Sequence, residues 1–198
     1  MFDKSVLKGF RTVGSFIIYE DTFAFMIGPD KTGERLGIVR IGGHIEGVES
    51  LAEALKREVL EEASINVDVI NSPKTFYKKT WENEYSEIEN FQHMKIKPLI
   101  IQGNENRAST IFLSYANEEP KASSEAYGIV FLRKSDIKEI CTNKLTLSDF
   151  VNKGGKLIQQ KDMDFNMEIY AGVHLLFLNR FMDDEKELID RFINRELD

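Results

Sequence analysis

The sequence predicts an α+β protein, in which a sheet-rich first part contains one inserted helix and is followed by a helical extension. Three observations support this fold class. Short apolar runs separated by polar loops, typical of strands, recur through the first 133 residues. Residues 50–63 contain helix formers throughout, with Leu51, Leu55 and Val59 at four-residue spacing. A second helical pattern, with a recurring apolar face, occupies residues 166–196.

The individual elements follow from local turn signals and from the period of the apolar residues. Glu20-Asp21 and Gly28-Pro29-Asp30 separate the first three strands, and polar loops separate the later ones. The predicted strands are residues 13–19, 22–27, 36–41, 65–70, 74–81, 96–102, 110–116 and 126–133. The predicted helices are residues 50–63, 135–140 and 166–196.

These elements divide the chain into one domain, residues 1–140, and a helical extension, residues 141–198. The apolar face of the extension carries Val173, Leu176 and Phe177. We expect this face to be buried, either by packing on the domain or in a homodimer interface. The extension contains eight basic and eleven acidic residues, a net charge of -3, which argues against a nucleic-acid-binding appendage.

Composition and charge exclude several classes of protein. The net charge of -7 and the pI near 5.2 disfavour a broad basic face for nucleic acid or for an anionic membrane. The only cysteine, Cys141, cannot form an internal disulfide, and its apolar surroundings favour a core residue over a nucleophile. No signal peptide or membrane-spanning run is apparent, so we expect a cytoplasmic protein.

The predicted helix 50–63 carries a cluster of carboxylates. Glu58, Glu61 and Glu62 share one face, because positions i, i+3 and i+4 are neighbours on a helix. Three like charges at this spacing repel unless a cation lies among them, and oxygen ligands suit Mg²⁺ or Mn²⁺. Glu49 lies just before the helix and can reach the same patch. The sequence therefore indicates a site for a hard divalent cation.

The alternative is a solvated acidic helix face. At 100° per residue, however, Glu58 and Glu62 lie beside the apolar stripe of the helix, where they would be half-buried. Arg57 has Glu53 and Glu61 at four-residue spacing, and pairing with them would orient the cluster. Immediately before the helix, Gly42-Gly43 allows the backbone to approach a metal and a phosphate closely.

The whole stretch resembles the signature of the Nudix hydrolase family. Eight of its nine defined positions match, and chance would give such a match at a set position with a probability on the order of 10⁻⁸. The corresponding residues are Gly43, Glu49, Arg57, Glu58, Val59, Glu61, Glu62, Ser64 and Ile65. Ser64 replaces the final glycine, which should cost about 1 kcal/mol or move the helix end toward Asn66.

The resemblance implies an α/β/α sandwich with a mixed sheet. It also implies that a metal-activated water attacks a phosphorus atom of a diphosphate. The metal ligands would be Glu58, Glu61 and Glu62, with Glu49 close to them. In similar proteins a carboxylate in the loop before a late strand often binds metal or acts as the base, and Glu125 stands at that place.

Several other residues have two interpretations. Arg40, two residues before Gly42, faces the phosphates or is a surface residue. His44 lies beside the predicted metal, yet a bystander is the better interpretation, since the carboxylates already suit the ion. Aromatic residues in strands stack on a base or, more often, fill a core. Those concerned are Phe76, Tyr77, Trp81 and Tyr85, next to Lys78 and Lys79, which could meet phosphate.

The sequence thus predicts a Mg²⁺- or Mn²⁺-dependent hydrolase that cleaves a nucleoside diphosphate linked to another group. A non-catalytic nucleotide sensor on the same fold is the alternative, which the complete set of Glu58, Glu61 and Glu62 disfavours. Isomerisation of an isoprenoid diphosphate would need further cysteine chemistry, and Cys141 alone does not supply it.

Overall fold

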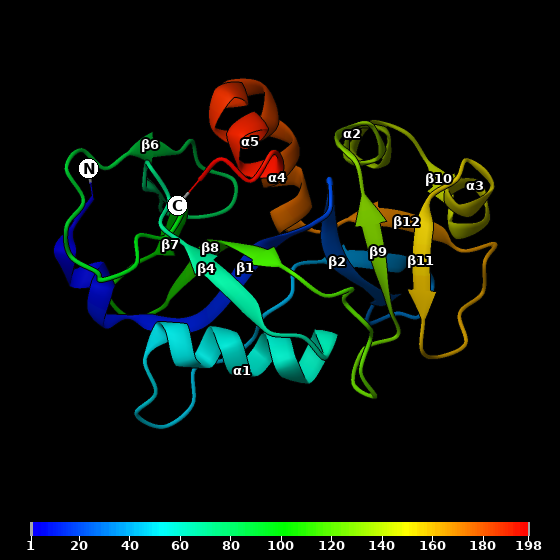
Figure 1. Ribbon diagram of the computed structural model, residues 1–198, viewed down its shortest axis with the longest axis horizontal. Coiled ribbons are helices and arrows are strands. Elements are labelled where there is room, and N and C mark those ends of the chain that lie inside the picture. Colours follow the sequence, from blue (N-terminus) through cyan, green and yellow to red (C-terminus); the bar gives the residue numbers. More distant parts are fainter. Residues whose placement is uncertain (1, 198) are drawn as a thin grey trace.

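The computed structural model describes residues 2–197, and within them twelve strands form one sheet with helices on both faces (Figure 1). The strands are β1 (Phe10–Tyr19), β2 (Thr22–Pro29), β3 (Leu36–Val39), β4 (Val67–Ile70), β5 (Phe76–Lys78), β6 (Ser86–Glu87), β7 (Ile100–Gly103), β8 (Ala108–Ala116), β9 (Gly128–Leu132), β10 (Leu145–Thr146), β11 (Lys156–Gln159) and β12 (Glu168–Ala171). The helices are the 3-10 helix η1 (Lys4–Lys8), α1 (Leu51–Ala63), α2 (Lys134–Thr142), α3 (Leu147–Asn152), α4 (Val173–Asp184) and α5 (Lys186–Ile193).

The sheet is mixed, as predicted. Its main order is β10-β12-β3-β2-β1-β8-β7-β5-β6, with β4 beside β8 and with β9 joining β2 to β11. The pairs β1–β8, β3–β12 and β5–β7 are parallel, whereas the other pairs are antiparallel. The central strand β1 therefore joins a parallel neighbour and an antiparallel one.

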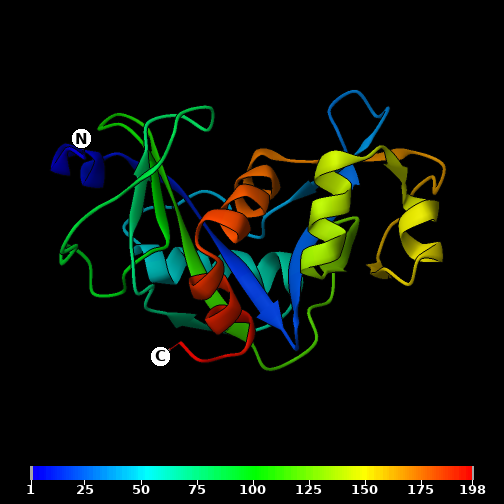
Figure 2. The same ribbon diagram turned by 90° about the horizontal axis from the view of Figure 1, so that it is seen from above.

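Alternating side chains of β1 supply two cores, because successive residues of a strand point to opposite faces. Val13 and Ile17 pack toward Leu55 of α1, below the sheet in Figure 1. Phe16 packs on the other face, where its ring centroid lies 6.4 Å from that of Phe177 in α4. Seen from above, α4 and α5 lie toward one half of the sheet and α2 and α3 toward the other (Figure 2). The predicted α/β/α sandwich is confirmed.

The C-terminal third departs from the prediction of a purely helical extension. Residues 168–171 form β12, which pairs with β3, and β11 pairs with β9. The prediction of helix over 166–196 is wrong for this strand, since four residues are too few for periodicity to separate helix from strand. Most of the remainder is helical, as α4 (Val173–Asp184) and α5 (Lys186–Ile193). The domain boundary at residue 140 stays a prediction, and strands from both sides of it share the sheet.

The predicted buried face of α4 is only partly correct. Phe177 is buried, but Val173 and Leu176 are 44% and 48% exposed. The face that packs on the sheet is instead formed with Leu178 and Phe181, so the buried stripe is rotated from the predicted one. Neither α4 nor any other helix within residues 2–197 has the length and apolar character that a membrane crossing requires.

Candidate active site

Helix α1 has a defined start and a defined end. Ser50 caps its first turn, since the Ser50 hydroxyl accepts from the Glu53 N–H while the Glu53 carboxylate accepts from the Ser50 N–H. At the other end Ser64 takes the left-handed conformation (φ 55°, ψ 32°), and its N–H bonds the Leu60 carbonyl at 3.0 Å. The replaced glycine therefore leaves the helix end in place, and the cap does not move to Asn66.

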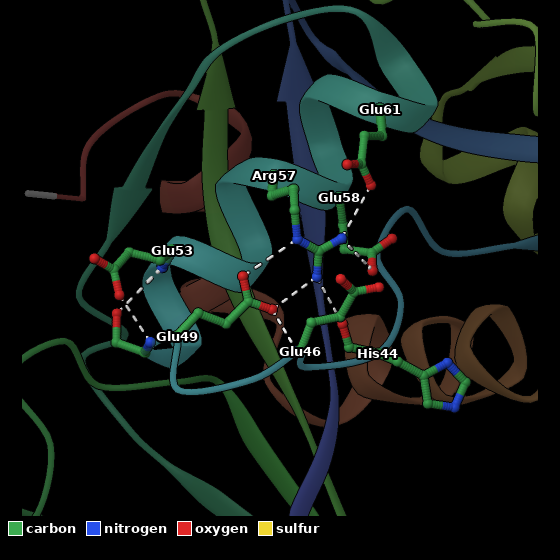
Figure 3. A network of polar contacts seen from close by, with 8 residues as sticks. His44, Glu46, Glu49, Glu53, Arg57, Glu58 and Glu61 are labelled. Carbon is green, nitrogen blue, oxygen red and sulfur yellow. Dashed lines mark hydrogen bonds and ion pairs between the residues drawn. The ribbon is translucent and has the colours of Figure 1, made fainter.

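Arg57 lies at the centre of the carboxylates (Figure 3). Its Nε and Nη2 bond the two oxygens of Glu49 at 3.2 and 2.7 Å, and Nη1 bonds Glu58 at 3.0 Å and Glu61 at 2.9 Å. Nη2 also bonds the His44 carbonyl at 2.8 Å, so all five N–H groups of the guanidinium have partners. The hydrogen bonds from Arg57 lower the pKa of Glu49, and those to the carboxylates raise the pKa of Arg57.

The predicted partners of Arg57 are half correct. The pair with Glu61 is confirmed, while the pair with Glu53 is wrong, because the Glu53 carboxylate is bonded to the Ser50 N–H at 2.8 Å. Glu49, eight residues before Arg57, takes that place. Helical spacing could not show this contact, since Glu49 lies in the loop ahead of α1.

Glu62 is held differently from the other carboxylates. One of its oxygens accepts the Gly42 N–H at 2.7 Å. Burial raises the pKa of Glu62 to about 7, with further contributions from the nearby charges of Glu58 and Glu125, while Gly42 and Arg40 act in the opposite direction. A carboxyl group with this pKa changes its charge near neutral pH and would be stabilised as an anion by a cation beside it.

The two glycines before α1 are required by close contacts. A Cβ on Gly43 would lie 2.4 Å from an oxygen of Glu58, so a larger residue would displace this carboxylate. Gly42 has φ of +129°, and a Cβ there would lie 2.4 Å from the Val13 carbonyl oxygen. The loop thus packs directly against both β1 and the carboxylates of α1. The predicted approach of its backbone to a metal and a phosphate stays a prediction.

The donor set suits a hard cation in its chemistry, although the side chains are not gathered around one point. Within residues 2–197, no group of three or more acidic, histidine or cysteine side chains stands close enough to hold a metal. Arg57 accounts for this, because it draws Glu49, Glu58 and Glu61 toward itself. Glu58, Glu61 and Glu62 each keep one oxygen with no hydrogen-bond donor among the described residues. Such oxygens are the ligands that Mg²⁺ and Mn²⁺ prefer.

The Arg40 side chain lies on the other side of loop 40–44 from the carboxylates of α1. It is buried (7% exposed), its Nη1 bonds the Val13 carbonyl at 2.9 Å, and its Nε has no partner in the described part of the chain. Burial lowers the pKa of Arg40 to about 10, against the attraction of Glu62 and Glu58, so it stays a cation at neutral pH. Arg40 is therefore not a surface residue, and it lines a cavity of about 180 Å³ together with His44 and Trp81.

The remaining predicted residues are Glu125, four aromatic residues and His44, and only some of them lie near the carboxylates or the cavity. Glu125 lies exposed in the loop before β9, near enough to Glu62 to raise its pKa. Of the four aromatic residues, Phe76 is buried and Tyr85 packs against it at 5.4 Å between ring centroids. Only Trp81 among them lines the cavity beside Arg40. The imidazole of His44 points away from the carboxylates (Figure 3).

Comparison with known proteins identifies the fold. No protein-family model matches this sequence, and no curated protein is significantly similar to it. A solved structure of a Nudix-family hydrolase from Clostridium perfringens matches 92% of this chain and 97% of its own, at 18% identity and a TM-score of 0.52. The chain has the Nudix fold. The match extends over nearly the whole length of both chains, so the C-terminal third falls within it.

A Nudix hydrolase from Nitrosomonas europaea also matches, over 89% of this chain and 71% of its own, at 14% identity and a TM-score of 0.47, which is too low to add to the argument. On this Nudix fold the carboxylates occupy α1 and the loop before it. The cavity beside Arg40 lies across the same loop, on the side where α4 begins, because His174 also lines it.

Proposed function

We propose that this chain hydrolyses a phosphoanhydride bond in a nucleoside diphosphate linked to another group. One observation carries the proposal. Three carboxylates of one helix, Glu58, Glu61 and Glu62, each keep an oxygen without a donor among residues 2–197, beside a glycine loop on a Nudix fold. Clustered carboxylates next to backbone that can approach a phosphate closely suit metal-assisted phosphoryl chemistry.

Glu58, Glu61 and Glu62 would hold Mg²⁺ or Mn²⁺. When bound, the ion would lower the pKa of a water molecule and offset negative charge on the diphosphate. Glu49 belongs to the same set, but both of its oxygens are bonded to Arg57, and it would have to leave Arg57 to reach a metal. Arg57 is thus a positioning residue that fixes where Glu58 and Glu61 point.

The chain's own groups would bind the substrate and move the proton. Gly42 and Gly43 leave the backbone open to the diphosphate, and Arg40 supplies positive charge for the substrate on the other side of the same loop. Glu125 is the proposed base. It lies in a loop, an element that can move when substrate binds, and its charge contributes to the raised pKa of Glu62. The water would attack a phosphorus atom, and the diphosphate would be split into two phosphate products.

We also infer a cytoplasmic location, in keeping with a single free cysteine.

Cys141 is half-buried, and burial raises the pKa of its thiol to about 11. A thiol with this pKa is protonated at neutral pH and is a poor nucleophile. The chemistry therefore falls to the carboxylates.

The proposal is tested by incubating the protein and Mg²⁺ or Mn²⁺ with dinucleotides, nucleotide sugars and nucleoside triphosphates. Products are separated by chromatography, and one reaction is repeated in H₂¹⁸O. We expect turnover of at least one member, strict dependence on the metal, and ¹⁸O in one phosphate product. Label in a non-phosphate product would contradict attack on phosphorus.

The same experiment separates the enzyme from a nucleotide sensor on this fold. Equilibrium binding of each nucleotide is measured alongside turnover, with the Glu58→Gln variant as the comparison. Tight nucleotide binding with no turnover of any compound, in both proteins, would favour the sensor and overturn the proposed function.

A further inference from the structure

Three guanidinium groups line the cavity beside Arg40, which we call the arginine cavity. Arg40 comes from the loop after β3, Arg11 from the start of β1 and Arg107 from the turn between β7 and β8. None of the three forms an ion pair within 4.0 Å among residues 2–197. No carboxylate of the described residues lines the cavity either, although the whole chain carries a net charge of -7.

Arg40 is placed in the cavity by the fold itself. A Cβ on Gly14 would lie 2.2 Å from its Nη1, and one on Gly42 would lie 2.6 Å from the same atom. Two glycines thus make room for a buried guanidinium whose Nε has no partner in the described structure. An unbonded, buried N–H on a cation is costly, and an anion bound by the atoms of Arg40 that line the cavity would offset part of the cost of burying this charge.

The walls of the cavity also favour an anion. His174 is the second residue of α4, so the helix begins at the cavity, and its first N–H groups carry partial positive charge. Burial and the charge of Arg40 lower the pKa of His174 to about 3, which leaves a neutral imidazole able to donate a hydrogen bond. The Trp81 ring packs edge-on against His174 at 4.6 Å between centroids.

The size of the cavity limits what can occupy it. Its volume of about 180 Å³ is below the roughly 300–1,000 Å³ of a site for a whole small molecule. It can therefore take one group of a larger substrate. Guanidinium groups bind carboxylate or phosphate in a bidentate manner, and three of them match a dianion better than a monoanion.

We propose that the arginine cavity binds a phosphomonoester group that the substrate carries in addition to the diphosphate. The preferred substrates are then diphosphate compounds with one further phosphate, held across loop 40–44 from the carboxylates of α1. The statement about substrates rests on the proposed function, whereas binding of phosphate by the cavity does not.

The first experiment measures binding without activity. Inorganic phosphate is titrated calorimetrically into the protein in EDTA, so that no divalent metal contributes. We expect saturable binding that weakens by about fivefold or more in Arg11→Gln and in Arg107→Gln. Both side chains are exposed, and melting temperatures verify that the variants fold. Arg191→Gln on α5 removes the same charge away from the cavity and should bind phosphate normally.

Three results would overturn the cavity assignment. The first is no saturable phosphate binding to the unaltered protein. The second is equal binding by the protein and by both cavity variants. The third is acetate binding as tightly as phosphate, which would make the cavity a carboxylate site.

The second experiment measures selectivity with metal present. kcat/KM is compared within two pairs that differ by one phosphomonoester, NADP⁺ against NAD⁺ and coenzyme A against its 3′-dephospho form. We expect about tenfold preference for the phosphorylated member of a pair that is turned over, lost in Arg107→Gln and kept in Arg191→Gln. Equal turnover within the pairs would overturn the inference and leave the proposed function intact. Phosphate binding with no turnover of any nucleotide would overturn the proposed function and leave the assignment of phosphate to the arginine cavity intact.

Discussion

Loop 40–44 separates two sites of opposite charge, and they differ in how their charges are partnered. On the α1 side, one arginine serves three carboxylates and has no free N–H group. On the α4 side, three arginines have no carboxylate partner in the part of the chain that the structure describes. The charges of the first site are paired with one another, whereas we propose that a bound anion neutralises those of the second. On this proposal the catalytic groups and the group that recognises the substrate lie on different faces of one loop.

The largest effect is expected from neutralising the carboxylate side. Glu58→Gln and Glu62→Gln each keep the shape of the side chain and remove one negative charge. An amide oxygen is a poorer ligand for a hard cation than a carboxylate oxygen, so metal binding should weaken. Turnover should fall by about 10²-fold or more, and the Mg²⁺ requirement should rise. Glu53→Gln on the same helix is the control, since its capping bond survives. Unchanged turnover and metal requirement in both site variants would remove the carboxylates from the mechanism.

Glu125 lies outside α1, in the loop before β9, and is the other carboxylate that we assign to the α1 side. If it is the base, Glu125→Gln should lower turnover by about 10²-fold, the effect typical of such residues. Metal affinity should change less than in Glu62→Gln, because Glu125 lies exposed in a separate loop. Steady-state kinetics and Mn²⁺ titration of both variants provide the comparison. A loss no larger than about twofold would show that Glu125 is not the base.

Gly43→Ala tests the contact between the loop and the carboxylates. The new Cβ would meet the Glu58 carboxylate at 2.4 Å, and the flexible end of that side chain can move aside. Stability should therefore change by only about 1 kcal/mol, while turnover falls by about tenfold through the displaced ligand. Chemical denaturation and kcat are measured on the same sample. A large loss of stability with normal kcat would mean that the loop has a structural role only.

The last comparison uses no substrate and concerns the free energy of unfolding of the metal-free protein, which should change with pH in opposite directions on the two sides. The pKa of Glu62 is raised from 4.5 to about 7, so the folded state binds more protons and stability falls as pH rises through this window. The pKa of His174 is lowered from 6.5 to about 3, so stability falls as pH drops below 6.5.

Each group should change the free energy of unfolding by about 1–2 kcal/mol over its pH window, allowing for solvent screening of half-buried groups. Urea denaturation in EDTA from pH 4 to 8 measures both slopes. Glu62→Gln should remove the loss toward neutral pH and leave the loss in acid, and His174→Gln should do the opposite. Parallel curves for all three proteins would show that neither group titrates as described.

Much of the sheet could be predicted from the sequence, because most of its strands are runs of apolar residues bounded by turns. The exceptions are short. Two-residue strands such as β6 and β10 carry no periodic signal, and β12 lies in a segment whose apolar residues also fit a helical face. The rotation of the buried face of α4 also escaped prediction, since both Val173 and Leu178 fit an apolar stripe and only tertiary packing selects between them.

The carboxylate side was visible in the sequence because helical spacing brings its members together. The arginine cavity was not, because its members come from β1, the loop after β3, a turn near residue 107 and the start of α4. No local pattern relates Arg11 to Arg107. Gly14 offered the only local sign, a glycine within a strand of apolar residues, which is typical of close approach by another group.

The parallel pairing of β3 with β12 has a consequence for synthesis of the chain. Residues 36–39 leave the ribosome long before residues 168–171, and until then one edge of β3 has exposed N–H and C=O groups. Contacts so distant along the sequence form slowly, since a long loop must close first. Loop 40–44, which directly follows β3, therefore acquires its final support only after residues 168–171 have been synthesised.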